Sequence, residues 1–178
     1  AMTLEEKASL LVGGRNKSYG GGNATTIGFT EAVVPGAAGL TQGIERLGIP
    51  PTVLSDGPAG VRIQPTREGS SRPYHATGFP VGTSLATTWN VDLVESVGKA
   101  MGEEVLDYGI DVLLAPGMNI HRSPLCGRNF EYYSEDPLVT GKMAAAFVRG
   151  IQKNGVGTSI KHFAVNSQET NRNHVDEV

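Results

Sequence analysis

The sequence predicts an α/β fold in which parallel strands alternate with helices. Three short apolar runs, beginning near residues 52, 111 and 156, are nearly continuous in hydrophobic residues, as buried parallel strands are. Amphipathic segments with helical spacing separate these runs, so we expect a parallel sheet with helices on both faces. Polar side chains collect where each run ends, at the edge that carries the active site both in (β/α)8 barrels and in doubly wound sheets.

The N-terminal part, residues 1–50, is predicted to be a helix followed by a glycine-rich connection. Thr3 and Glu6 form a T-x-x-E capping box at the start of the helix, and Gly13-Gly14 ends it. The connection at residues 15–48 is long for a loop within a compact domain. It is either a binding or lid segment or a surface excursion, and the sequence favours neither.

The first repeating unit begins after Pro50-Pro51 with the strand "TVLSDG". A long irregular section follows at residues 58–88 and ends at Asn90, a residue type that caps helix N-termini. The helix that follows is expected to end at Gly109. Its inner face has apolar residues at helical spacing, namely Val94, Val97, Met101, Val105 and Tyr108.

The second unit has the strand "IDVLLAPG", which leads into Asn119, His121 and Arg122. After an irregular section, Asp136-Pro137 combines an N-cap residue with a proline at the first helical position. This helix is expected to end at Asn154-Gly155, and its inner face contains Val139, Met143, Phe147 and Ile151. The third strand is then "VGTSI", so that residues 51–178 are predicted to contain the first three strand–helix units. A barrel requires eight, which indicates the first part of a larger protein.

Composition excludes several classes of function. Hydrophobic residues make up 39% and charged residues 19% of the 178 residues, as in folded globular proteins. The net charge of −3, without a block of Lys and Arg, argues against nucleic-acid binding. No apolar run reaches the roughly 20 residues of a membrane span, so none is expected. The cellular compartment (cytoplasm, periplasm or outside the cell) stays open.

The sequence predicts neither a metal site nor a cofactor. Cys126 is the only cysteine, which excludes a disulfide framework within the chain and any multi-cysteine metal site. The His, Asp and Glu residues do not have the spacing of a ligand cluster. The phosphate-binding pattern G-x-x-x-x-G-K-[ST] is also absent.

The candidate site residues lie at the ends of the three strands. Asp56 follows the first strand, where a pocket carboxylate and an ordinary S-D-G turn are both plausible interpretations. Lys161 and His162 follow the third strand side by side, and only a bend in the chain lets both reach one site. Loops at the same end add cations, amides and one acid: Arg62, Arg122, Arg128, Asn166, Gln168, Glu169 and Arg172.

This mixture of groups suits a ligand with many hydroxyl groups. A carboxylate accepts hydrogen bonds from neighbouring O–H groups, while Lys, Arg and His donate to hydroxyl and ring oxygens. We therefore expect a glycan.

Four motifs, taken together, resemble the bacterial β-glucosidases of glycoside hydrolase family 3. They are "LSDGPAGVR", "FPVGTSLATTWN", "NIHRSPLCGRNFEYYSEDP" and "IKHFAVNSQETNR", which occur in this order and span essentially the whole chain. The resemblance implies the N-terminal part of a (β/α)8, TIM-barrel-like domain, with the remaining barrel and an α/β sandwich domain absent here. It also implies hydrolysis of terminal non-reducing β-D-glucosyl residues with retention of configuration. The substrate would be a β-glucoside or an oligosaccharide.

The resemblance also implies roles for particular residues. Asp56 would accept from sugar hydroxyls, Lys161 and His162 would donate to adjacent hydroxyls, and Arg172 would close the pocket. The implied sugar-binding set is Asp56, Arg62, Arg128, Lys161, His162 and Arg172. The family's nucleophilic aspartate, in an S-D-W-like motif, and its acid/base glutamate do not occur in these 178 residues. No catalytic residue is therefore expected in this chain, and the chain alone is expected to be inactive.

Several alternatives are kept. The N-acetylhexosaminidase branch of the family follows K-H-F with P-G-H-G, whereas this chain has Ala164-Val165-Asn166. The xylosidase branch differs around Arg128. A non-catalytic carbohydrate-binding fragment would fit the missing carboxylates.

Whether the full-length protein forms a homo-oligomer stays open, and the isolated chain is predicted to aggregate through the unpaired edge of its last strand.

Overall fold

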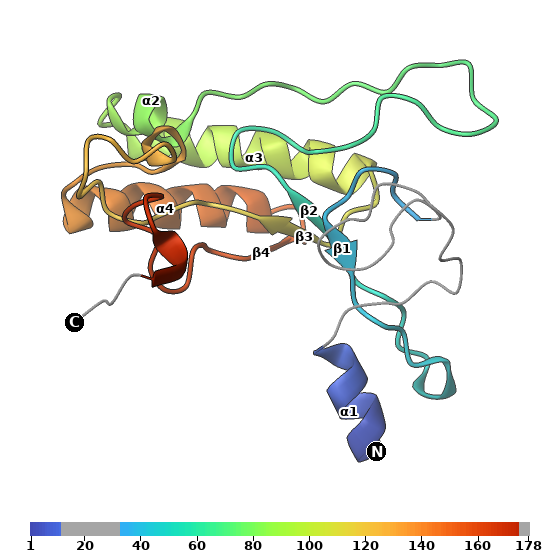
Figure 1. The fold of residues 1–178 in the computed structure, drawn as a ribbon. Helices are drawn as coiled ribbons and strands as arrows, with labels where there is room; N and C mark the ends of the chain where they lie inside the picture. The colour runs from blue at the N-terminus through green and yellow to red at the C-terminus, as the bar shows by residue number, and fades with distance from the viewer. Residues whose placement is uncertain (12–32, 175–178) are drawn as a thin grey trace.

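A computed structural model describes residues 1–11 and 33–174 of the chain (Figure 1). Four strands form one open sheet in the order β1-β2-β3-β4: β1 (Gly39–Leu40), β2 (Val53–Asp56), β3 (Val112–Leu114) and β4 (Gly157–Thr158). The β2–β3 and β3–β4 pairs are parallel, and β1 pairs with β2 in the antiparallel direction. The three strands predicted from apolar runs are thus confirmed as a parallel sheet.

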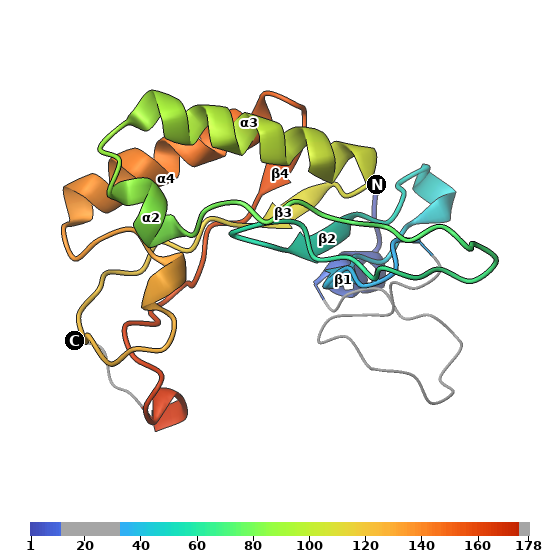
Figure 2. The same cartoon turned by 90° about the horizontal axis from the view of Figure 1, so that it is seen from above.

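Two long helices cover one face of this sheet. Helix α3 (Val91–Asp107) connects β2 to β3, and helix α4 (Pro137–Gln152) connects β3 to β4. Figure 2 shows both helices on the same side of the strands. Because the strands follow one another in chain order and such crossovers share one hand, successive helices fall on the same face. The expectation of helices on both faces is wrong for the described part of the chain, whose arrangement is that of a barrel wall.

Both helices begin at the capping residues that the sequence indicates. The side-chain oxygen of Asn90 accepts from the Leu93 N–H at 3.0 Å. The Asp136 carboxylate accepts from the N–H groups of Leu138 and Val139, with Pro137 at the first helical position. Such caps satisfy N–H groups that have no partner within the helix.

The helices pack together through glycines. A Cβ on Gly98 would lie 2.5 Å from the Phe147 carbonyl oxygen, and a Cβ on Gly150 would lie 2.1 Å from the Glu95 carbonyl oxygen. Only residues without a side chain allow the two backbones to approach this closely. The core beneath the helices contains Val94, Met101, Val105, Phe147 and Ile151, each fully buried or nearly so.

The N-terminal helix α1 (Leu4–Leu10) has the predicted capping box, with Thr3 accepting from the Glu6 N–H and Glu6 accepting from the Thr3 N–H. Its side chains are not buried, and Glu6 forms an ion pair with Arg46 of the 3-10 helix η1 (Glu45–Leu47). The predicted end of α1 at Gly13-Gly14 lies outside the described residues. So does most of the glycine-rich connection.

In addition to η1, the structure has three short elements in sections that were predicted from the sequence to be irregular. Strand β1 extends the sheet by two residues, helix α2 (Gly82–Ala86) precedes α3, and the 3-10 helix η2 (Asn129–Glu131) follows β3. A further 3-10 helix, η3 (Arg172–His174), lies near the end of the described chain. All are too short to show a periodic pattern of hydrophobic residues. Among the described helices, none is both long enough and apolar enough to cross a membrane.

Candidate functional site

Asp56 is the last residue of β2, where the chain turns sharply. The Gly57 N–H donates to Oδ1 of Asp56 at 3.0 Å. Gly57 has φ = 148°, and a Cβ there would lie 1.9 Å from the Gly60 carbonyl oxygen. Glycine is therefore required at this turn. The Asp56 side chain lies at the carboxyl end of the strand and is 40% exposed.

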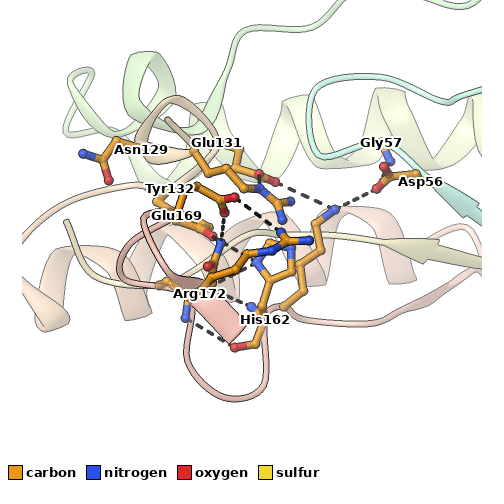
Figure 3. Close-up of polar contacts among 12 residues, drawn as sticks. Asp56, Gly57, Asn129, Glu131, Tyr132, His162, Glu169 and Arg172 are labelled. Carbon is orange, nitrogen blue, oxygen red and sulfur yellow. Dashed lines mark hydrogen bonds and ion pairs between the residues drawn. The ribbon is translucent and has the colours of Figure 1, made fainter. Parts of the chain in front are cut away.

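Lys161 reaches Asp56 from the neighbouring end of β4. The ladder between the segments after β3 and β4 continues through a parallel bridge between Gly117 and Lys161, with the Lys161 N–H donating to Pro116 at 3.0 Å. From this position Nζ lies 2.7 Å from Asp56 Oδ1 and 3.8 Å from Glu131 Oε2 (Figure 3). The Lys161 side chain is only 15% exposed. It thus bridges two carboxylates.

Arg128 and Glu131 belong to the turn that forms η2. The Arg128 Nε–H donates to Glu131 Oε1. The Glu131 side chain is 6% exposed, whereas that of Arg128 is 28% exposed. Arg128, Glu131, Lys161 and Asp56 therefore form one continuous chain of alternating charges.

His162 is held through one ring nitrogen, Nδ1, and through its backbone. The Asn119 Oδ1 accepts from the His162 backbone N–H at 2.8 Å, and the Asn119 amide donates to the His162 carbonyl at 3.3 Å. The imidazole Nδ1 lies 3.0 Å from the Tyr132 hydroxyl and 3.2 Å from Asn119 Oδ1. These contacts orient the ring so that Nε2 is the nitrogen left for a ligand.

Asp56, Arg128, Glu131, Tyr132, Lys161 and His162 form one polar cluster at the strand ends. The loop after His162 contacts this cluster. The Asn166 amide donates to the Tyr132 hydroxyl at 3.0 Å and to Glu169 Oε1 at 2.7 Å. Glu169 Oε2 in turn lies 3.4 Å from Arg172 Nη1. Arg172 is 56% exposed and reaches the cluster only through Glu169 (Figure 3).

The charges of the cluster set the protonation of its members. Burial raises the pKa of Asp56, but the hydrogen bond and charge of Lys161 outweigh burial and bring this pKa below its ordinary 3.8. Burial, followed by the charges of Arg128 and Lys161, lowers the pKa of His162 below 6.5. At neutral pH the site thus has an ionised Asp56 and an uncharged His162 between two cations.

Of the six residues in the implied sugar-binding set, the structure brings four into direct contact with this cluster: Asp56, Arg128, Lys161 and His162. The Arg62 N–H donates to the Asp56 carbonyl at 2.9 Å, but its side chain is exposed and has no hydrogen bond or ion pair within the described residues. The Arg62 charge nevertheless contributes to the low pKa of Asp56. Arg122 is exposed as well.

Two residues that contact the candidate side chains, Glu131 and Tyr132, are not among those predicted from the sequence. Both are buried, with 5% and 0% exposure, and both contact candidate residues directly. They lie within the motif "NFEYYSEDP". A glutamate and a tyrosine embedded among aromatic residues next to a candidate arginine were the available signal.

Within the described residues there is no group of three or more His, Cys, Asp or Glu side chains arranged to hold a metal ion. The arrangement instead offers one partly exposed carboxylate, an ammonium, a guanidinium and an imidazole around the strand ends. Such a set can accept from and donate to several hydroxyl groups at once.

Comparisons with known proteins agree with this geometry. Residues 45–178 match the model of the glycosyl hydrolase family 3 N-terminal domain. The chain is 43% identical, over 99% of its length, to thermostable β-glucosidase B of Acetivibrio thermocellus, and 42% identical, over 98% of its length, to an exo-α-(1→6)-L-arabinopyranosidase of Bifidobacterium longum. It spans 21% of the length of each of these two relatives.

Solved structures give the same family. The structure of β-glucosidase 3B from Thermotoga neapolitana in complex with α-D-glucose superimposes with a TM-score of 0.85 at 58% identity, covering 96% of this chain and 23% of that protein. The prediction of an α/β fold from the N-terminal part of a family 3 barrel is thereby confirmed, although the sheet of this chain is open. The chain belongs to glycosyl hydrolase family 3, within its N-terminal domain.

Proposed function

We propose that this chain is the glucose-binding part of a β-glucosidase whose full-length form hydrolyses terminal non-reducing β-D-glucosyl residues. The observation that carries the proposal is the convergence of Asp56, Lys161, Arg128 and His162 at the carboxyl ends of β2 and β4. The 58% identity to a β-glucosidase solved with glucose supports the same assignment.

The geometry suggests how a pyranose would be held. Oδ1 of Asp56 already accepts from Lys161 and Gly57, whereas Oδ2 has no hydrogen bond from the described residues. Because the pKa of Asp56 is low, Oδ2 is an anionic acceptor suited to sugar hydroxyls. The ammonium of Lys161 and the guanidinium of Arg128 supply donors around it, and Nε2 of His162 is a further hydrogen-bonding atom. Arg62 and Arg172, which are exposed, would complete the pocket wall.

Asp56 and Glu131 are not suited to the chemical step. Retaining glycosidases need two carboxyl groups about 5–5.5 Å apart, one as nucleophile and one as acid and base. Asp56 is engaged by an ammonium ion, and Glu131 is buried between two cations. We assign Asp56 to binding and place the nucleophile and the acid/base in the rest of the full-length protein. Residues 1–50 would lead into the barrel, and residues 51–178 would form its first three units.

The test is hydrolysis of a panel of aryl glycosides by the full-length protein. The panel contains p-nitrophenyl β-D-glucoside, β-D-xyloside, N-acetyl-β-D-glucosaminide and α-L-arabinopyranoside, the last because a relative carries that activity in its name. We expect the glucoside to have the highest kcat/KM and β-glucose to be the first product seen by NMR. Hydrolysis of none of these substrates, combined with glucose binding by calorimetry, would replace the proposal with a carbohydrate-binding role.

A further inference from the structure

Glu131 is the most deeply buried acid of the site. Its residue exposure is 5%, so little of the residue is accessible to a ligand at the strand ends. Room for the carboxylate exists because residue 117 is glycine. A Cβ at Gly117 would lie 3.2 Å from Glu131 Oε2 and 3.1 Å from the Tyr132 ring.

Each oxygen of the Glu131 carboxylate faces a different cation. Oε1 accepts from the Arg128 Nε–H, and Oε2 lies 3.8 Å from Lys161 Nζ. A guanidinium and an ammonium that both point into one site repel each other, and a carboxylate between them removes that repulsion. A buried acid with two cations also fixes their positions, since moving either one would leave a buried charge unpaired.

Lys161 is shared between the two carboxylates. Its contact with Asp56 is 2.7 Å and its contact with Glu131 is 3.8 Å. The ammonium contacts only Oδ1 of Asp56, and Oδ2 has no hydrogen bond from the described residues. The position of Glu131 therefore affects the two groups that would donate to sugar hydroxyls and the one that would accept from them.

We propose that Glu131 is a positioning residue of the sugar pocket, which acts on substrate only by holding the Arg128 guanidinium and the Lys161 ammonium in place. This inference rests on the proposed function, because it concerns the same site.

The chain provides a matched control between the two long helices. Glu95 of α3 also accepts from two cations, Arg149 Nε at 2.9 Å and Lys153 Nζ at 2.5 Å, both in the α4 region. Glu95→Gln and Glu131→Gln thus remove the same charge from the same kind of two-cation arrangement. Only Glu131→Gln alters the site.

The experiment compares wild type, Glu131→Gln, Glu131→Asp and Glu95→Gln in the full-length protein. The measured quantity is kcat/KM for p-nitrophenyl β-D-glucoside and for its 2-, 3-, 4- and 6-deoxy analogues. We expect Glu131→Gln to lower kcat/KM for the parent glucoside by about tenfold or more, as for loss of a charge-assisted contact. The loss should be smaller for the analogue that lacks the hydroxyl bound by Arg128 or Lys161. Glu131→Asp should recover part of the activity, and Glu95→Gln should match wild type.

A merely structural role gives a different result. It lowers kcat/KM by the same factor for every analogue, and it gives no recovery in Glu131→Asp; either outcome overturns the inference. If Glu131→Gln does not fold, Glu131→Asp decides the question through the same panel. It keeps the charge on a shorter side chain, so its partial loss of kcat/KM relative to wild type should again be smaller for the analogue that lacks the hydroxyl bound by Arg128 or Lys161.

Failure of the proposed function is recognised separately, by a wild type that hydrolyses none of the glucosides. Crystal structures of wild type and Glu131→Gln then decide the inference. An Arg128 guanidinium and a Lys161 ammonium displaced from their wild-type positions support it, and unchanged positions overturn it.

Discussion

The Lys161 ammonium lies 2.7 Å from the Asp56 carboxylate, although 105 residues separate the two in the sequence. The sheet itself creates this contact. Asp56 ends β2 opposite Leu114 of β3, and the chain after β3 pairs with Lys161 through Gly117. The parallel pairing of β2 with β3, and of the segment after β3 with Lys161, therefore places both side chains at one edge of the sheet. Strand pairing alone is sufficient to bring the two charges together.

Replacement of Asp56 tests the central contact. Asp56→Ala leaves the 15%-exposed Lys161 without its close partner and removes the acceptor proposed for sugar hydroxyls. Unpaired buried charges and lost charge-assisted hydrogen bonds are costly. We expect kcat/KM of the full-length protein for p-nitrophenyl β-D-glucoside to fall by roughly two orders of magnitude or more. Asp107→Asn, at the exposed end of α3, is the control and should match wild type. Unchanged kinetics in Asp56→Ala would remove Asp56 from the site.

The low pKa of Asp56 gives stability a defined dependence on pH. The carboxyl is more acidic in the folded protein than its ordinary value of 3.8, so the unfolded state binds the proton first. The contribution of the ionised Asp56 carboxylate to the free energy of unfolding is fully present above pH 3.8. It is lost as the pH falls below that value and through the pKa of the folded state. We expect wild type to melt above Asp56→Asn at about pH 6, and the difference in Tm to narrow as the pH falls below 3.8. A difference that is constant with pH would show that the ion pair does not perturb Asp56.

His162 should titrate below its ordinary range. Burial lowers its pKa, and the charges of Arg128 and Lys161 lower it further, against smaller opposite effects of Glu131 and Asp56. NMR of protein labelled at histidine, assigned with His162→Gln, should give a midpoint below 6.5. Arg128→Met removes one of the two cations and should raise the midpoint. A midpoint at or above 6.5 in wild type would mean that the ring is more solvated than its contacts indicate.

The sequence allowed the scaffold to be predicted, and it pointed to most residues of the candidate site, for identifiable reasons. Strands β2 and β3 are apolar runs, and α3 and α4 have both caps and periodic inner faces, so each element has a local signal. Asp56, Lys161 and His162 were selected as candidates because parallel strands end at a common edge.

Other features depend on contacts that no local pattern contains. Strand β1 exists because two residues pair with β2, and its sequence is otherwise that of a loop. Glu131 looks like an ordinary turn residue until Arg128 and Lys161 are known to surround it. Arg62 and Arg172 match the family motifs, but their exposed side chains are not fixed by any contact with the strand ends. Long-range pairing, rather than propensity, decides all of these cases.

The glycines of α4 should respond oppositely to the same substitution. A Cβ at Gly150 would lie 2.1 Å from the Glu95 carbonyl oxygen and 2.7 Å from the Lys99 nitrogen, both backbone atoms of α3 that cannot move aside alone. A Cβ at Gly141 would meet nothing within 4 Å. Gly150→Ala should therefore force the helices apart and lower the free energy of unfolding by about 1–3 kcal/mol or more. Gly141→Ala should raise it by up to about 1 kcal/mol, because alanine loses less backbone entropy in a helix. Thermal unfolding of both variants measures the difference, and a stabilised Gly150→Ala would show that α3 and α4 are not in close backbone contact.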